Sequence, residues 1–87
     1  MKVSVWDTYV KRTDNRVMHF DILVPSDVTA EETIFSYGKT YLKSKAMEGA
    51  ELTARECKFC HIEKASDEVM LAIEQKGYFI IEMENCN

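Results

Sequence analysis

Two cysteines and a histidine stand close together in the segment ECKFCHIEKA, residues 56–65, as Cys57, Cys60 and His61. The C-x-x-C-H pattern is typical of covalent haem attachment, of a zinc ligand pair or of a redox dithiol. It also arises when a β-strand happens to contain two cysteines. Each interpretation requires different features elsewhere in the chain, and the presence or absence of those features distinguishes the interpretations.

Haem and zinc both ask for features that the chain lacks. Covalent haem requires export, and the N-terminal segment MKVSVWDTYV alternates like a strand instead of showing the apolar stretch of a signal peptide. Zinc requires about four nitrogen or sulfur ligands. Cys57, Cys60 and His61 supply three, with His19 or Cys86 as a fourth, but no second cysteine pair follows. Zinc therefore remains an alternative to a structural strand.

A redox dithiol needs both sulfurs on one side of the backbone. In a regular strand, residues three positions apart point to opposite faces. The alternation of residues 56–64 predicts such a strand, in which cysteine serves as a small buried hydrophobe. It assigns Cys57, Phe59, His61 and Glu63 to one face and Cys60 and Ile62 to the other.

A second group of chemically useful residues depends on how two N-terminal strands pair. Residues 2–10 and 16–24 are rich in β-branched and aromatic types, and the intervening KRTDN favours a turn. A two-residue loop would scatter polar residues over both faces of this hairpin. A three-residue loop pairs Trp6 with Ile22, separates polar from apolar residues and puts Asn15 in a left-handed conformation. The second register is favoured, because a slip of one residue moves every side chain to the wrong face.

In the favoured register, Asp7, Tyr9, His19 and Asp21 share one face of the hairpin. Their Cβ atoms would be separated by roughly 5–8 Å. A histidine between carboxylates is the arrangement that orients a ligand nitrogen or strengthens proton binding. The alternative is a solvated face held by cross-strand hydrogen bonds. His61 extends the group if the third strand adjoins the hairpin.

The remaining elements must position these residues. A first helix is expected from about Thr29, which forms a capping box with Glu32. Gly38 lies in its middle, where glycine costs about 1 kcal/mol relative to alanine. The expected compensation is a close approach of this helix to the sheet. A second helix is expected from Ser66 to Gly77.

The resulting order, β-β-α-β-α-β, predicts an α+β fold. The expected architecture is a two-layer α/β sandwich or roll, with two helices on a four-stranded sheet. The segment YFIIEM, residues 78–83, is apolar almost throughout and is typical of a central strand covered on both faces. The last β-α-β link is long enough for a parallel crossover, so the sheet is expected to be mixed.

Composition sets the class of protein. The chain has 87 residues, 46% hydrophobic and 30% charged, which predicts one domain over residues 1–83 and a flexible tail over 84–87. A net charge of −4 without a basic run disfavours nucleic acid and anionic membranes as partners. No apolar run approaches the roughly 18–20 residues needed to cross a bilayer. The cytoplasm is therefore the expected location, and the three cysteines are not expected to form a disulfide framework.

Four segments together carry a family resemblance: VSVWDTYV, MHFDILVP, CKFCHIEKA and GYFIIEME. They resemble the domain-of-unknown-function family twenty-twenty-four, a family of short bacterial one-domain proteins. The resemblance is collinear over nearly the whole chain. It implies a roll-like or two-layer α/β fold and implies no activity, cofactor or catalytic residue. The matching positions are Trp6, Asp7, His19, Phe20, Asp21, Cys57, Cys60, His61 and Glu63.

These observations predict a small cytoplasmic binding or interaction domain without an expected cofactor. The chain shows no marked nucleophile and no Gly-rich phosphate loop, which disfavours an enzyme. The predicted binding surface is the polar hairpin face extended by His61. The alternative is a zinc-binding or thiol-redox protein centred on the C-x-x-C-H segment. The sequence identifies no partner, although Val5, Val17 and Leu23 on the polar hairpin face are compatible with a homodimer.

Overall fold

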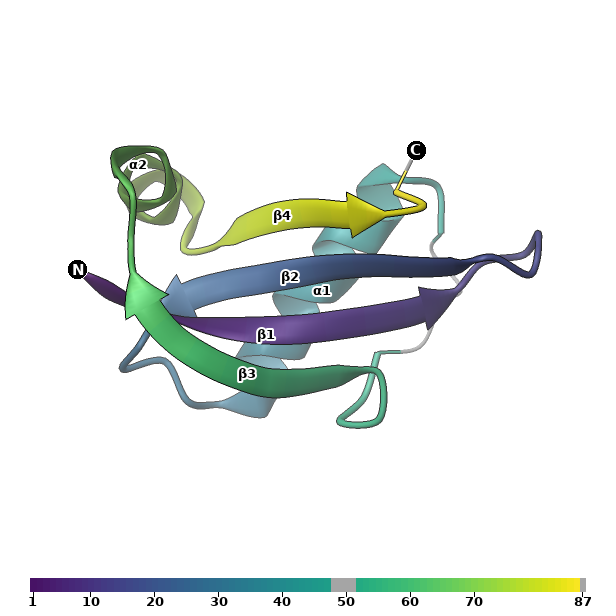
Figure 1. Cartoon of the computed structure of the whole chain (residues 1–87), viewed down its shortest axis with the longest axis horizontal. Coiled ribbons are helices and arrows are strands. Elements are labelled where there is room, and N and C mark those ends of the chain that lie inside the picture. Colours follow the sequence, from purple (N-terminus) through teal and green to yellow (C-terminus); the bar gives the residue numbers. More distant parts are fainter. Residues whose placement is uncertain (48–51, 87) are drawn as a thin grey trace.

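The computed structural model describes residues 1–47 and 52–86. Its elements confirm the predicted α+β class and the predicted order (Figure 1). They are β1 (Lys2–Lys11), β2 (Val17–Pro25), α1 (Glu31–Ser44), β3 (Cys57–Lys64), α2 (Asp67–Lys76) and β4 (Phe79–Glu84). Within these residues, neither helix is both long and apolar enough to cross a membrane.

The strands form one sheet in the order β3-β1-β2-β4, and all neighbouring pairs are antiparallel. The predicted mixed sheet with a parallel crossover is therefore wrong. Val69 and Ile73 of α2 pack against Val3, Val5 and Leu23 of the central strands. After β3 the chain therefore passes over both central strands. Strand β4 then pairs with the free edge of β2, so that β3 and β4 form the two opposite edges of the sheet (Figure 1).

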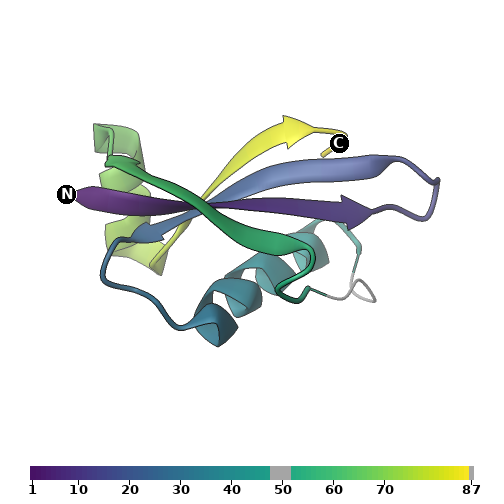
Figure 2. The same ribbon diagram turned by 60° about the horizontal axis from the view of Figure 1, so that its bottom comes forward.

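Helix α1 lies along one face of the sheet (Figure 2), and α2 packs on the opposite face at one end of the sheet. The fold is therefore the predicted α+β arrangement of two helices on one four-stranded sheet, with one helix on each face. The cause is that β1 and β2 send apolar side chains to both faces, so that Trp6 and Ile22 face the α1 side while other residues meet α2. Helix α2 covers only one end of its face. We call the uncovered remainder of that face, around Asp7 and His19, the outer face.

The hairpin between β1 and β2 has the predicted three-residue-loop register. Trp6 lies opposite Ile22, and Asp7 lies opposite Asp21. Asn15 takes the left-handed conformation, with φ of 68°. Asparagine tolerates this conformation better than most residues, so the loop chemistry and the face pattern agree on one register.

Strand β4 is an edge strand, not the central strand that its apolar sequence predicted. Its residues are half-buried or exposed. Ile80 packs on the α1 side, whereas Phe79 and Ile81 pack on the α2 side. The apolar run therefore reflects contacts with both helices, which a strand at the edge makes as well as one in the centre.

The helix boundaries follow the sequence in one case and not in the other. Helix α2 begins as predicted, with the Val69 backbone N–H donating to Ser66 Oγ at 3.3 Å, and ends at Gly77 with φ of 92°. The capping box predicted at Thr29 is wrong. Helix α1 begins one residue later, after Ala30, and has no side-chain cap.

The tail expected over residues 84–87 contacts the sheet wherever the structure describes it. Asn85 Nδ2 donates to the Val17 carbonyl at 2.8 Å. Cys86 is buried, with its Sγ 3.2 Å from the His19 carbonyl oxygen. These contacts argue against free fraying of the described part of the tail.

Gly38 lies where α1 approaches the sheet, as the sequence predicted. A Cβ there would overlap with Leu52 Cδ2 and lie 3.0 Å from Ile22 Cδ1. We expect Gly38→Ala to lower the free energy of unfolding by about 1–2 kcal/mol, because overpacking outweighs the gain in helix propensity. Urea unfolding measures the change, with the exposed position Lys39→Ala as control. A stabilised Gly38→Ala variant would show instead that Leu52 moves aside.

Candidate functional site

Asp7 and Asp21 lie directly opposite each other in the centre of the hairpin, with their side chains on the outer face. Like charges in one cross-strand pair destabilise a sheet. The register that buries the apolar residues on the α1 side enforces this pairing of carboxylates. A compensating group is therefore expected between them, either a proton or a cation.

His19 lies beside both carboxylates. Its Nε2 atom is 3.7 Å from Asp7 Oδ1 and 3.5 Å from Asp21 Oδ1. Both distances exceed the roughly 3.2 Å limit of an ordinary N–H···O hydrogen bond. Within the described residues, His19 Nε2 and Asp21 Oδ1 are buried atoms without a hydrogen-bond partner. Two unsatisfied polar atoms thus face the same small space.

Tyr9 fixes the orientation of the imidazole ring. The two rings are stacked, with centroids 4.1 Å apart and planes 11° apart. Tyr9 lies opposite His19 in the hairpin, so one register pairs both the rings and the aspartates. The side chain of Asp7 is 36% exposed and that of Asp21 is 14% exposed. Asp7 therefore forms the solvent-facing side of the group.

The surroundings move the pKa values of the two carboxyls apart. Burial, followed by interaction with Asp7, raises the pKa of Asp21 to about 6. Hydrogen bonding with Asp21 is the largest of the interactions that lower the pKa of Asp7, and Cys60 and His19 act in the same direction. In mild acid the pair therefore holds one proton, on Asp21. At neutral pH both carboxylates are charged.

The ligand atoms of Asp7, His19 and Asp21 all lie within 4.8 Å of one another. No other three His, Cys, Asp or Glu side chains among residues 1–47 and 52–86 are grouped in this way. Ligands at the usual zinc distances are about 3.4 Å apart in a tetrahedron. The two nitrogen–oxygen distances are close to that value, so the group is spaced for a small cation. We call these three residues the Asp-His-Asp site.

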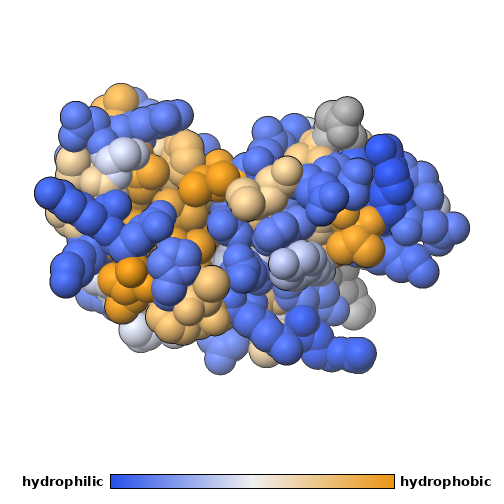
Figure 3. Space-filling model, viewed as in Figure 1, coloured by the Kyte–Doolittle hydropathy of each residue, from blue (hydrophilic) through white to orange (hydrophobic). Residues whose placement is uncertain are grey.

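Figure 3 shows the outer face in space-filling form. Hydrophobic atoms gather mainly at the end covered by α2, and hydrophilic residues predominate toward the hairpin loop. The described residues that pack with α2 on this face include Val3, Val5 and Leu23, and none of the Asp-His-Asp site. Solvent reaches the site through the partly exposed side chain of Asp7.

The C-x-x-C-H segment lies in β3 next to this site and contains a β-bulge. Val5 pairs with His61 and Trp6 with Phe59, which leaves Cys60 as an extra residue in β3. The bulge reverses the alternation of every later residue. The faces predicted for His61, Ile62 and Glu63 are therefore wrong, although those of Cys57, Phe59 and Cys60 are as expected.

The two cysteines of this segment lie on opposite faces of the sheet. Cys57 is buried on the α1 side, and burial raises the pKa of its thiol. Cys60 is exposed on the outer face, close to Asp7. The structure therefore does not bring Cys57, Cys60 and His61 together as a ligand set or a dithiol.

His61 shares the outer-face side but lies apart from the Asp-His-Asp site. Its Nδ1 is 3.2 Å from Cys60 Sγ, and its Nε2 is 3.2 Å from Glu63 Oε2. It pairs with Val5 of β1, whereas His19 pairs with Tyr9 further along that strand. Four of the five residues predicted for the binding surface thus converge, and His61 does not join them.

Two charged neighbours of the site were missed in the sequence. Lys58 lies opposite Asp7 on β3, and Glu84 lies opposite His19 on β4. Their proximity depends on the order of the strands in the sheet. No local pattern in the sequence carries that information.

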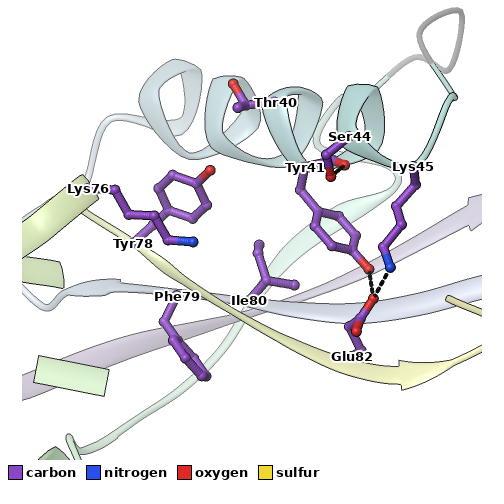
Figure 4. A pocket seen from close by; sticks show the side chains of 9 residues that line it. All are labelled: Thr40, Tyr41, Ser44, Lys45, Lys76, Tyr78, Phe79, Ile80 and Glu82. Atoms are coloured by element: carbon purple, nitrogen blue, oxygen red, sulfur yellow. Dashed lines mark hydrogen bonds and ion pairs between the residues drawn. The ribbon is translucent and has the colours of Figure 1, made fainter. Parts of the chain in front are cut away.

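A pocket of about 330 Å³, separate from the Asp-His-Asp site, lies between α1 and β4 (Figure 4). Tyr41 of α1 and Lys45, the residue directly after this helix, point toward Glu82 of β4. Lys45 Nζ is 2.8 Å from a Glu82 carboxylate oxygen, and the Tyr41 hydroxyl donates to the same oxygen. Burial and this hydrogen bond raise the pKa of Tyr41. Because these polar groups already bind one another, they join the helix to the edge strand and are not available to a ligand.

Fold and site define a class of small α+β domains with an all-antiparallel sheet and a His–carboxylate group on its outer face. The family model described as Domain of unknown function (DUF2024) matches residues 1–83, and the chain belongs to this family. The chain is similar to protein NE1680 from Nitrosomonas europaea, whose NMR structure was determined as a structural genomics target. The two chains share 50% identity over 100% of each, with a TM-score of 0.87. No curated protein matches the sequence.

Proposed function

We propose that this domain binds a divalent first-row transition-metal ion, such as Zn²⁺ or Mn²⁺, through Asp7, His19 and Asp21. The observation that carries the proposal is a pair of opposed carboxylates beside an imidazole nitrogen that has no hydrogen-bond partner in the described part of the chain. A bound cation would neutralise the repulsion between the carboxylates. It would also satisfy the two buried atoms that face each other.

The donor set favours this class of ion. A neutral imidazole nitrogen suits Zn²⁺ and its neighbours, whereas Mg²⁺ and Ca²⁺ prefer oxygen ligands alone. The stacked Tyr9 ring would hold the imidazole in place. Ligand sets are usually supported by such neighbouring groups.

Three protein ligands leave a coordination position open toward solvent. Such a position accepts water or an anionic group from a second molecule. The exposed side of Asp7 provides the way in. The domain would thus be a binding module whose outer face uses a metal ion to recognise an anionic group of a partner.

Calorimetric titration of the untagged protein with Zn²⁺ and with Mn²⁺ at pH 7.5 tests this proposal. We expect one ion per chain, and we expect His19→Ala and Asp21→Asn each to weaken binding by at least about 10-fold. Mg²⁺ is the control ion. The matched control variant is His61→Ala, because His61 is also paired with a carboxylate, that of Glu63, on the same side of the sheet.

The two histidines distinguish a specific site from casual surface binding. Weaker binding in His61→Ala equal to that in His19→Ala would indicate non-specific coordination by exposed imidazoles. Absence of binding to the wild-type protein at millimolar Zn²⁺ and Mn²⁺ would refute the proposal.

A further inference from the structure

Among the residues that the structure describes, no strand pairs with the outer edge of β3. Among the described residues, β3 pairs with β1 alone, and all its residues after Cys57 are exposed. An edge strand of this length presents unpaired backbone N–H and C=O groups that can bind another strand. Its side chains indicate which strand would fit.

Two large apolar side chains of β3 are exposed on the α1 side of the sheet. Phe59 and Ile62 are each 52% exposed. Phe59 meets the buried Trp6 edge-on, with ring centroids 5.8 Å apart, and its other side is open. Ile62 lies opposite Ser4 on the same side. The apolar core therefore continues to the edge of the sheet and ends there uncovered.

The sequence of β3, CKFCHIEK, is complementary to itself. When a second copy runs antiparallel so that Cys60 faces His61, Phe59 faces Ile62 of the second copy. In the same register Lys58 faces Glu63. A two-fold axis repeats each pair, which gives two apolar pairs and two ion pairs across one interface.

The bulge at Cys60 is what allows this register. In a regular strand, Lys58 and Glu63 would point to opposite faces, because five positions separate them. The extra residue corrects this. Lys58 now lies opposite Asp7 and Glu63 opposite Val3, both on the outer-face side.

The same correction applies to the apolar pair. Phe59 lies opposite Trp6 and Ile62 opposite Ser4, so both side chains point to the α1 side. Each set can therefore meet its counterpart on the matching face of a joined sheet. An unrelated peptide strand would have no reason to reproduce both matches.

We propose that β3 is a homodimer interface, in which two copies pair antiparallel through their β3 edges around a two-fold axis. The product is a continuous sheet of eight strands, four from each chain. Because one edge strand offers a small contact area, the dimer is weak, with a dissociation constant on the order of 10–100 µM. This proposal is independent of metal binding, since none of the three metal ligands lies on β3.

Sedimentation velocity from 10 µM to 1 mM protein, with EDTA present, measures dimerisation through this interface. Because Lys58 faces Glu63, each charge can be reversed alone and then both together. We expect Lys58→Glu and Glu63→Lys each to weaken dimerisation by about 10-fold or more, because each places like charges opposite one another. The variant carrying both substitutions should restore the dimer, since the charges are then exchanged. Circular dichroism checks that every variant is folded.

Glu84→Lys is the matched control, since it reverses an exposed charge on β4, the other edge of the sheet. It should leave the dimer unchanged. A wild-type protein that stays monomeric at 1 mM overturns the proposal, as does a dimer that responds to Glu84→Lys and not to Lys58→Glu. Failure of the double variant to restore association overturns the register and with it the proposed pairing.

Discussion

We expect Asp21→Asn to raise the free energy of unfolding of the metal-free protein at pH 7.5 by about 1–2 kcal/mol. The pKa of Asp21 is raised from its ordinary value of 3.8 to about 6. At about 1.4 kcal/mol per tenfold change in proton affinity, ionising this carboxyl in the folded protein costs up to about 3 kcal/mol. The lowered pKa of Asp7 offsets part of that cost. An amide at position 21 avoids the charge altogether.

The dependence of stability on pH has the sign that linkage between proton binding and folding requires. A raised pKa means that the folded state holds the proton more tightly than the unfolded state does, so the stabilising effect is present below about pH 4 and is lost as the pH rises through about 6. In urea unfolding between pH 4 and 7.5 with EDTA present, the free energy of unfolding of Asp21→Asn should therefore increase relative to that of the wild-type protein as the pH rises. Asp14, Glu56 and Glu82, whose pKa values are lowered, contribute equally to both proteins.

Asp7→Asn serves as the control for this measurement. Burial is the largest cause of the raised pKa of Asp21 and the interaction with Asp7 comes second. Removing Asp7 should therefore reduce the loss of stability between pH 4 and 6 without abolishing it. A difference between wild-type and Asp21→Asn that stays constant with pH would contradict the assignment of the proton to Asp21.

We expect Phe20→Ala to lower the free energy of unfolding by about 3–5 kcal/mol. Phe20 is fully buried at the centre of the α1 side, with its ring centroid 4.6 Å from that of Tyr41. Truncation leaves a cavity between α1 and the sheet that neighbouring side chains fill only in part. For a domain of this size the melting temperature should fall by about 15–30 °C, which thermal unfolding followed by circular dichroism measures.

Phe59→Ala is the matched substitution on the same side of the sheet. Phe59 is 52% exposed at the edge strand, so its truncation should cost less than about 1 kcal/mol at low protein concentration. The loss of unfolding free energy in Phe59→Ala should be larger at concentrations where the β3 dimer forms, because dimerisation stabilises the folded wild-type chain by mass action. Equal losses for Phe20→Ala and Phe59→Ala would contradict the burial of the core described above.

The local parts of the fold were predictable because their causes lie close together in the sequence. Asn15 and the face pattern around it select one hairpin register, and that register alone brings Asp7, His19 and Asp21 together. The cap at Ser66 and the stop at Gly77 likewise act within one helix. In each case a few neighbouring residues decide the outcome.

The non-local parts were not predictable in the same way. The position of β4 at the edge depends on how α2 crosses β1 and β2, and the apolar sequence of β4 suits either a central or an edge position. The proximity of Lys58 to Asp7 also depends on the order of the strands, because these residues lie on neighbouring strands β3 and β1. His61 was assigned to the face of Cys57 because alternation was assumed to be unbroken, and one unpaired residue was enough to reverse it.

The bulge at Cys60 also bears on how this family tolerates changes in length. A relative without residue 60 would regain strict alternation along β3, and no side chain after it would change face. Loss of residue 61 would have the same effect, because residues 60 and 61 share a face, whereas loss of residue 62 or 63 would invert those that follow it. A gap at position 60 in an alignment is therefore structurally silent, whereas a gap two residues later would mark a different edge, and comparisons of distant members should place their gaps accordingly.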